Sequence, residues 1–320
     1  MKVAVIKGGI SAEREVSLVT GREVADALRI EGFTVTEIDA SPDRLLSALR
    51  AAAPDVIFNA LHGDWGEDGE VQTLLDRAGL PYTHSDASAS RLAMNKDETK
   101  DVLKTHGIGV PYGETVSRFL VAEGGVMPTP YVVKPNGSGS SSSVYLVMDE
   151  DADLLAAIGN DAGLGDEPVV ERYIPGRELT VAVMDGKAMA VTEIVPKSWY
   201  SYEEKYGDDA AEHILPADIP ADVRATCLDY AERAHRALGY TGLTRTDFRY
   251  DDTGVDNENL SDLANRVVTL ELNTQPGMTP TSLAPEQAAY CGLSFGELCR
   301  WIVEDALCRH RERNSKGSAP

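Results

Sequence analysis

Short apolar runs alternate with amphipathic segments over the first quarter of the chain, and this alternation restricts the fold more than any other feature. The run at 2–9 is apolar, has the length of a strand and ends at paired glycines. Helical periodicity follows at 13–32, where Gly32 is placed to end a helix. The two patterns then repeat, with strands predicted at 33–39 and 55–63 and helices at 42–52 and 69–79. This βαβαβα order predicts a doubly wound parallel sheet, with functional loops at the carboxyl ends of its strands.

The remainder of the chain mixes strands and helices in an α+β order. A helix is predicted at 95–107, and residues 129–149 have the pattern of a strand, a Gly/Ser loop and a second strand. Residues 167–195 contain predicted strands joined at an Asp-Gly hairpin. The later elements are expected to be a Tyr-rich loop at 198–210, a helix near 220–238, strands at 244–250 and 266–273, an exposed insertion at 251–265, a helix at 294–310 and a frayed tail at 311–320.

Length and composition narrow the class of protein. A chain of 320 residues is too long for one small core, so two or three domains are expected, the first ending near residue 90. Hydrophobic content of 42% suits a soluble protein, and no apolar run has the length of a membrane span. The N-terminus lacks a signal-peptide layout, which predicts a cytoplasmic protein. The formal net charge of −22 argues against a nucleic-acid partner.

The cysteines show no spacing for a metal site or a redox pair and are predicted to be reduced and structural. They are Cys227, Cys291, Cys299 and Cys308.

The stretch KPNGSGSSSSVYLV, residues 134–147, suggests a phosphate-binding hairpin. Lys134 ends one predicted strand, and a second predicted strand follows the glycines and serines. A P-loop has its lysine after the glycines, so this order excludes Walker-type binding. The flanking strands argue against a linker. A glycine-rich hairpin can place N–H donors and a lysine over phosphate groups, and an ordinary mobile hairpin tip is the alternative.

Two late strands carry polar side chains in an unusual pattern. Arg245 and Asp247 are two residues apart and share one strand face, as do Glu271 and Asn273. Two carboxylates and an amide oxygen are hard ligands of the kind that suit Mg²⁺ together with substrate phosphates. A solvated outer face with salt bridges is the alternative. The following TQPGMTPTSL contains a tight turn at Gly277 whose N–H groups could bind an anion, which favours a metal–phosphate site.

Two further segments each allow two interpretations. GGISAEREVS lacks the GxGxxG dinucleotide pattern. Glu13 at its predicted helix start is either an ordinary first-turn acid or the receptor of a substrate ammonium group. The loop at 198–210 is either a lid or a packed surface loop.

Together these segments resemble one family, the D-alanine–D-alanine ligases of the ATP-grasp superfamily. The resemblance covers about residues 2–308 and rests on eight motifs in the family order. They are GGISAEREVS, ALHGDWGEDG, MNKDETK, VVKP, ERYIPGRELT, YSYEEKY, TRTDF and ELNTQPGMTPTSL. The resemblance implies an N-terminal α/β domain at 1–90, a central subdomain with the phosphate loop at 91–178 and a C-terminal subdomain with the lid and metal site at 179–320. The last two would sandwich ATP.

The resemblance also implies roles for individual residues. Those implied to contact ATP phosphates are Lys96, Lys134 and the lid residue Lys205. Those implied to contact adenine and ribose are Glu171, Tyr173, Ile174 and Glu178. The implied metal ligands are Asp247, Glu271 and Asn273. Those implied for the first amino acid and the loop closing over it are Glu13, His62, Ser140 and Tyr206. Those implied for the oxyanion and the second carboxylate are Arg245, Gly277, Ser282 and Leu283.

The activity implied by the resemblance is formation of D-alanyl-D-alanine for peptidoglycan precursors. ATP would phosphorylate one D-alanine carboxylate, and the amine of a second D-alanine would displace phosphate. The cofactors implied are two Mg²⁺ ions, with Mn²⁺ as a substitute, in a cytoplasmic homodimer. Tyr206 stands where the family selects an amine over a hydroxyl nucleophile.

Two departures from the family pattern leave other functions open. Ser142 and Ser143 replace the usual end of the phosphate loop, and a left-handed Ser143 would cost roughly 1–2 kcal/mol. Asp86 stands where glycine is usual. These motivate a paralogous ligase with another substrate pair. A nucleotide-binding regulator without turnover is a further alternative.

Overall fold

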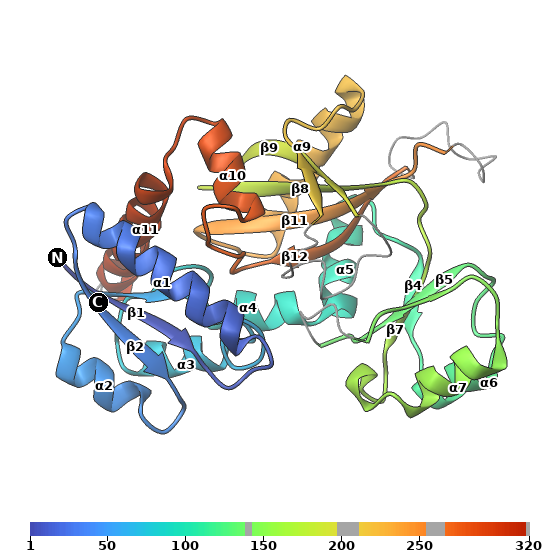
Figure 1. The fold of residues 1–320 in the computed structure, drawn as a ribbon, viewed down its shortest axis with the longest axis horizontal. Helices are drawn as coiled ribbons and strands as arrows, with labels where there is room; N and C mark the ends of the chain where they lie inside the picture. Colours follow the sequence, from blue (N-terminus) through green and yellow to red (C-terminus); the bar gives the residue numbers. More distant parts are fainter. Residues whose placement is uncertain (138–142, 197–210, 254–265, 318–320) are drawn as a thin grey trace.

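The structure is a computed structural model, and it describes residues 1–137, 143–196, 211–253 and 266–317. These residues form three sheets covered by helices (Figure 1). The predicted loop at 198–210 and the part of the insertion at 254–265 lie outside the described residues.

The N-terminal sheet has three strands in the order β2-β1-β3, and both pairings are parallel, which confirms the prediction. Its strands are β1 (Lys2–Gly8), β2 (Thr34–Ala40) and β3 (Val56–Asn59), and its helices are α1 (Arg14–Ile30), α2 (Leu45–Ala52) and α3 (Glu70–Arg77). β1 is the middle strand and is largely buried, which explains its unbroken apolar run. The carboxyl ends of β1 and β3 therefore meet at one edge, beside the start of α1.

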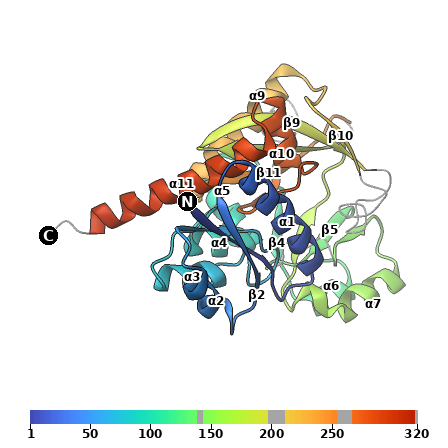
Figure 2. The same ribbon diagram turned by 60° about the vertical axis from the view of Figure 1, so that its left-hand side comes forward.

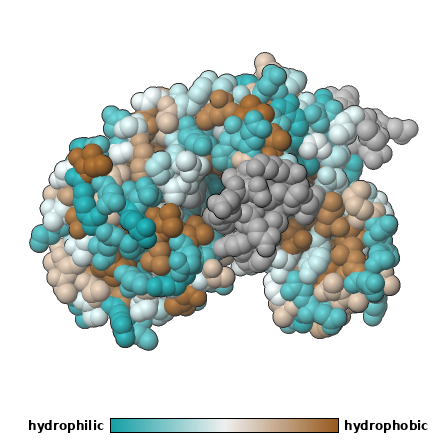
Figure 3. All heavy atoms as spheres, viewed as in Figure 1, coloured by the Kyte–Doolittle hydropathy of each residue, from teal (hydrophilic) through white to brown (hydrophobic). Residues whose placement is uncertain are grey.

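The central sheet has four antiparallel strands in the order β4-β7-β5-β6. Its elements are β4 (Gly113–Thr115), α6 (Arg118–Glu123), β5 (Tyr131–Lys134), β6 (Tyr145–Val147), α7 (Ala152–Asn160), the 3-10 helix η1 (Ala162–Leu164) and β7 (Val169–Arg172). This central unit has an apolar core of its own, in which Tyr131, Val133 and Ile158 are fully buried. In Figure 3 it forms the lower-right lobe, separated from the lower-left lobe by an open notch.

The C-terminal sheet has five antiparallel strands in the order β10-β9-β8-β11-β12. Its strands are β8 (Arg177–Met184), β9 (Lys187–Val195), β10 (Glu212–Ile214), β11 (Leu243–Tyr250) and β12 (Val267–Asn273), and its helices are α9 (Ala221–Ala237), α10 (Leu283–Tyr290) and α11 (Phe295–Gly317). Asp185 and Gly186 both have positive φ, as a two-residue hairpin requires, so the predicted Asp-Gly turn is confirmed.

The N-terminal and five-stranded sheets share one apolar core. Val3 and Val24 belong to the same buried cluster as Leu243 and Met278. Two connecting helices, α4 (Ala87–Met94) and α5 (Lys96–Thr105), precede the central unit. The division of the chain at residues 90 and 178 remains our proposal.

The end of the chain differs from the prediction. The frayed tail was expected from Arg311, but α11 continues to Gly317, so the prediction was wrong for 311–317. No proline or glycine interrupts 297–316, and i,i+4 pairs such as Asp305–Arg309 at 2.7 Å support the helix. Figure 2 shows the last turns of α11 projecting from the body. Among the described residues, no helix has both the length and the apolar character needed to cross a membrane.

Candidate active site

Strands β11 and β12 bring four predicted site residues onto one face. Asp247 lies opposite Glu271, and Arg245 lies opposite Asn273, which confirms that each pair shares a face. The buried Asp247 carboxylate accepts bonds from Arg245 Nε at 2.9 Å and Nη2 at 2.7 Å. The Thr180 hydroxyl of β8 also donates to Asp247 Oδ1, at 2.6 Å. The protein itself therefore fixes both the carboxylate and the guanidinium.

The donor atoms at this place suit magnesium. Asp247 and Glu271 supply carboxylates, and Asn273 supplies an amide oxygen. In the parts of the chain that the structure describes, no group of three or more His, Cys, Asp or Glu residues could hold a metal ion. A magnesium ion bound here would therefore need substrate phosphates and water to complete its coordination, which is the arrangement that this ion favours.

Glu171 of β7 is a buried carboxylate between two lysines. It is 2% exposed, Lys134 Nζ lies 2.5 Å from its Oε1, and Lys100 of α5 pairs with its Oε2. Burial, followed by the charges of Lys134 and Lys96, lowers the pKa of Lys100. Because an unpaired buried charge is costly, this carboxylate orients both lysines.

Lys96 is the first residue of α5 and lies near the same strand end. Its backbone N–H donates to the Asn136 carbonyl at 3.2 Å, and the Asp97 N–H donates to Asn136 Oδ1 at 3.0 Å. These bonds attach the start of α5 to the residue two positions after Lys134. The buried lysines at this point can neutralise phosphate oxygens, although the whole chain is strongly acidic.

Of the predicted adenine and ribose residues, Tyr173 and Ile174 lie on the connection from β7 to β8, whereas Glu171 lies in β7 and Glu178 in β8. The Tyr173 N–H donates to the Pro130 carbonyl at 3.2 Å, so this residue still belongs to the edge of the central unit. Glu178 lies two residues into the region paired with β11, opposite Arg249. A nucleotide bound along this connection would contact both the central unit and the five-stranded sheet.

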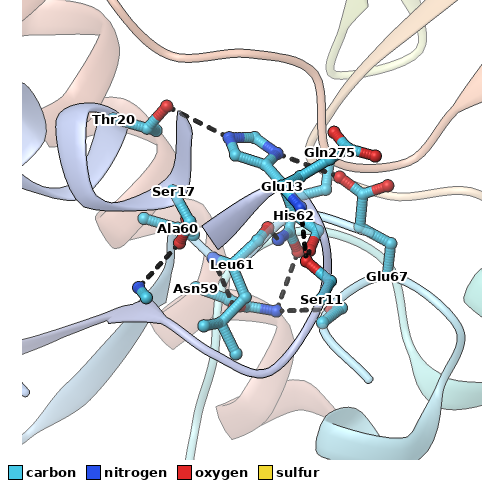
Figure 4. A network of polar contacts seen from close by, with 12 residues as sticks. Ser11, Glu13, Ser17, Thr20, Asn59, Ala60, Leu61, His62, Glu67 and Gln275 are labelled. Atoms are coloured by element: carbon cyan, nitrogen blue, oxygen red, sulfur yellow. Dashed lines mark hydrogen bonds and ion pairs between the residues drawn. The ribbon is translucent and has the colours of Figure 1, made fainter. Parts of the chain in front are cut away.

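At the edge of the N-terminal sheet, the start of α1 meets the loop after β3 (Figure 4). Glu13 directly precedes α1 and is buried. A Cβ on Gly63 would lie 3.3 Å from Glu13 Oε1, which shows how closely the two approach. The Ser11 hydroxyl accepts from the Glu13 N–H at 3.2 Å and donates to the His62 carbonyl at 2.6 Å. The helix dipole favours negative charge at a helix N-terminus, and a carboxylate there can receive an ammonium group.

The His62 ring is fixed from both sides, as Figure 4 shows. Its Nε2 lies 3.0 Å from the Thr20 hydroxyl, and its Nδ1 lies 3.0 Å from Glu67 Oε1. Only 5% of the histidine is exposed. The residue therefore holds the loop that faces Glu13, with its ring occupied by neighbours within the protein.

Gln275 joins this loop to the turn after β12. Its Oε1 accepts from Asn59 Nδ2 at 2.8 Å, and its Nε2 donates to the Leu61 carbonyl (Figure 4). Both Gln275 and Asn59 are buried. This carboxamide therefore ties the loop of His62 to the segment that leads to Gly277.

Gly277 lies beside the start of α10. A Cβ at Gly277 would lie 3.2 Å from Ser282 Oγ. That oxygen accepts from the Thr279 N–H at 3.1 Å, and Leu283 is the first residue of the helix. A helix N-terminus attracts carboxylates, so this place suits the carboxylate of a second amino acid.

Comparison with known proteins places the chain in a family. The family model described as D-ala D-ala ligase C-terminus matches residues 116–304, and D-ala D-ala ligase N-terminus matches 46–85. The D-alanine–D-alanine ligase of Ruegeria pomeroyi is 52% identical over 310 residues, 96% of each chain. The chain belongs to the D-alanine–D-alanine ligase family. The family member from Gluconobacter oxydans is 50% identical over 314 residues, 97% of this chain and 100% of that one.

Solved structures of the family have the same fold. The D-alanine–D-alanine ligase from Bacillus anthracis, complexed with ATP, matches with a TM-score of 0.79 and 27% identity over 98% of this chain and 99% of that chain. The ligase from Coxiella burnetii matches with a TM-score of 0.80 and 25% identity over 98% of this chain and 96% of that one. The predicted ATP-grasp fold class is thereby confirmed.

Some site residues expected from the ligase resemblance lie outside the described residues. In addition, the structure places two residues at the candidate site that the sequence did not predict. Those outside are Ser140, Lys205 and Tyr206. The residues missed are Lys100 and Gln275. Lys100 had a usable signal, because it lies one helical turn after Lys96 and so shares its helix face. Gln275 had none, since its partners are over 200 residues away in sequence.

Proposed function

We propose that this chain is an ATP-dependent ligase that joins two D-alanines into D-alanyl-D-alanine through an acyl phosphate. The observation that carries the proposal is the shared face of β11 and β12, where Arg245 is bonded to Asp247 opposite Glu271. Anion-stabilising and metal-binding groups are adjacent there, as a phosphoryl transfer followed by an acyl transfer requires. The D-alanine–D-alanine ligases that this chain resembles support the substrate.

In the first step a carboxylate oxygen of one D-alanine attacks the γ-phosphorus of ATP. A new O–P bond forms, and the bond to ADP breaks. Lys134 and Lys96 neutralise negative charge on the phosphates, and Glu171 keeps Lys134 oriented. Glu13 receives the ammonium group of this D-alanine. Magnesium held by Asp247, Glu271 and Asn273 would supply positive charge that stabilises the phosphate oxygens.

In the second step the amine of another D-alanine attacks the carbonyl carbon of the acyl phosphate. The C–N bond forms, the C–O bond to phosphate breaks, and the proton that the amine loses leaves with the departing phosphate. Arg245 and the Gly277 N–H stabilise the oxyanion that develops. Ser282 and the N–H of Leu283, at the start of α10, hold the carboxylate of the incoming amino acid.

The remaining parts of the proposal follow the family resemblance. The protein would use two Mg²⁺ ions, with Mn²⁺ able to replace them, and would act as a cytoplasmic homodimer in peptidoglycan precursor synthesis. Ser140, Lys205 and Tyr206 would close over the first amino acid and the phosphates.

Asp86 has a structural explanation that removes one reason to expect another substrate pair. Its Oδ1 accepts from the N–H groups of Ser88 and Ala89, both at 3.0 Å, so it is the N-cap of α4. A residue that caps a helix gives no reason to expect a different substrate.

The test is phosphate release from ATP and Mg²⁺ against a panel of D- and L-amino acids, with the product identified by mass. We expect strong turnover with D-alanine alone and a product of the mass of D-alanyl-D-alanine. Turnover only with another amino acid would overturn the assignment of D-alanine as the substrate. No turnover with any amino acid would favour a regulatory nucleotide-binding protein.

A further inference from the structure

Three charged residues follow one another along a single face of β11. Arg245, Asp247 and Arg249 alternate along the strand, and in register with β8 they lie opposite Ala182, Thr180 and Glu178. Successive residues on one strand face are about 6.5 Å apart. Arg249 therefore lies about 13 Å from Arg245, at the opposite end of the same row.

Arg249 binds the connection from β7 to β8 at several points. Its Nε donates to the Ile174 carbonyl at 3.1 Å, and its Nη2 donates to the Gly176 carbonyl at 2.9 Å. Its Nη1 lies 3.8 Å from Glu178 Oε2. Its guanidinium carbon lies 5.8 Å from the centre of the Tyr173 ring. The Arg249 side chain thus approaches Tyr173, Ile174 and Glu178. These are the residues after Glu171 that the family resemblance implies for binding adenine and ribose.

The backbone packs closely at the same place. Gly176 has a φ of +92°, and a Cβ there would lie 2.2 Å from the Tyr250 carbonyl. The connection therefore packs directly against the end of β11, and position 176 has no room for a side chain. A planar guanidinium with donors in a fixed fork can hold two carbonyls and face a carboxylate at once, which a lysine ammonium cannot reproduce.

We propose that Arg249 is a positioning residue for the nucleoside of ATP. It fixes the Ile174 carbonyl and aims the Glu178 carboxylate, so that adenine and ribose meet preformed partners. This inference rests on the proposed function, because the roles of Ile174 and Glu178 come from it. If Glu178 accepts a hydrogen bond from a ribose hydroxyl, the protein should bind ATP more tightly than the analogue that lacks this hydroxyl, either 2′-deoxy-ATP or 3′-deoxy-ATP. The loss of that preference is therefore the specific readout.

The experiment compares Arg249→Met and Arg249→Lys with the unchanged chain and with the control Arg177→Met. Arg177 is a neighbouring arginine that bonds to Glu193 and to the Asp218 carbonyl, and so it does not hold the connection. Initial rates are measured with ATP and with each deoxy analogue, and the KM for D-alanine is measured at saturating ATP. Calorimetric titration with each nucleotide, without an amino acid, gives binding independently of ligation.

We expect Arg249→Met to raise the KM and Kd for ATP about tenfold, with kcat and the KM for D-alanine close to those of the unchanged chain. One of the two deoxy analogues lacks the ribose hydroxyl that bonds to Glu178. The preference of the protein for ATP over that analogue should fall by a similar factor. Arg249→Lys keeps the charge facing Glu178 and should recover part of that preference. Arg177→Met should leave nucleotide preference unchanged.

Two outcomes would overturn the inference: equal weakening of ATP and both deoxy analogues by Arg249→Met, or the same loss of preference in Arg177→Met. If Arg249→Met does not fold, Arg249→Lys with unchanged nucleotide binding and preference would overturn it as well. Failure of the unchanged chain to ligate D-alanine would instead count against the proposed function, and the titrations would still test Arg249.

Discussion

The N-terminal sheet and the central unit are attached to the five-stranded sheet in different ways. The N-terminal sheet shares an apolar core with it, in which Val24 and Leu243 belong to one buried cluster. The central unit has a separate core around Ile158. Polar groups attach that unit instead: the carboxylate of Glu171 pairs with Lys100 of α5, and Arg249 holds the connecting chain.

This difference divides the candidate site into two halves. Glu13, His62 and Gly277 belong to the pair of sheets with the shared core, so the proposed amino-acid end of the site is built into a packed interior that resists deformation. Lys134 belongs to the central unit, whose contacts depend on charge and geometry. We infer that the amino-acid half is the fixed part of the site and that the phosphate half responds to the nucleotide.

The largest expected effect comes from a cavity in the shared core. Leu243→Ala removes a fully buried side chain and should lower the free energy of unfolding by about 2–5 kcal/mol. Ile158→Ala is the matched change in the central core, where the residue is also fully buried. Hydrogen exchange should show lost protection in both β1 and β11 for Leu243→Ala, but only in the central sheet for Ile158→Ala. Equal losses in β1 for both variants would contradict separate cores.

Arg245→Ala tests whether the two halves of the site have separate tasks. Removal of an oxyanion donor should reduce kcat about 10²–10³-fold while ATP binding remains largely intact. Steady-state rates and ATP titration check this, and Arg249→Met provides the reverse pattern. A parallel loss of ATP binding and ligation in Arg245→Ala would contradict its oxyanion role.

Two buried histidines outside the central unit, His84 and His235, are expected to make the fold sensitive to acid, whereas the central unit, residues 113–172, contains no histidine. Burial, followed by the charge of Arg309, lowers the pKa of His84 to about 3, and burial followed by Arg236 lowers that of His235 to about 4. The unfolded chain binds a proton at each histidine below about pH 6.5, while the folded chain does not until the pH reaches the lower value. Stability should therefore fall as the pH drops from 6.5, by about 2 kcal/mol per histidine between pH 7 and 5.

Denaturant unfolding at pH 7 and pH 5 measures this pH dependence. His84→Asn should flatten it, since asparagine tolerates the positive φ of +68° at that position. The exposed His106 is the matched control, and His106→Asn should leave the slope unchanged. An unchanged slope in His84→Asn would count against a buried neutral histidine.

The smallest effect is expected in the central unit, at Ser143. Its φ is +60°, so Ser143 has the left-handed backbone whose cost the sequence analysis considered. Its hydroxyl bonds to Asp161. Both Ser143→Gly and Ser143→Ala lose that bond, but only glycine relieves the backbone, so the glycine variant should be about 1 kcal/mol more stable than the alanine variant. Thermal unfolding measures the difference, and an alanine variant as stable as the glycine variant would contradict the strain.

The parts of the molecule that the sequence could predict are those governed by local rules. Alternation along a strand places Arg245 with Asp247, and helical or strand periodicity locates most elements. The parts that it could not predict depend on chains meeting in three dimensions. The Glu171–Lys100 pair joins residues 71 apart, and the Asn59–Gln275 bond joins residues 216 apart. In a sequence, a glutamine or a lysine carries no mark of the residue that will bond to it in the fold.

The register of β11 with β12 shifts between Asp247 and Phe248, where Glu271 and then Thr269 are the partners and Leu270 is passed over. Because of this one extra residue, Thr269 faces the core with Phe248 while Glu271 faces the site with Asp247, although strict alternation would give both the same side. Loss of the single codon for Leu270 would restore an unbroken ladder. Thr269 and Glu271 would then be adjacent in sequence, and ordinary alternation would keep them on opposite faces, so such a deletion would remove the bulge without exchanging the side chains of the two faces.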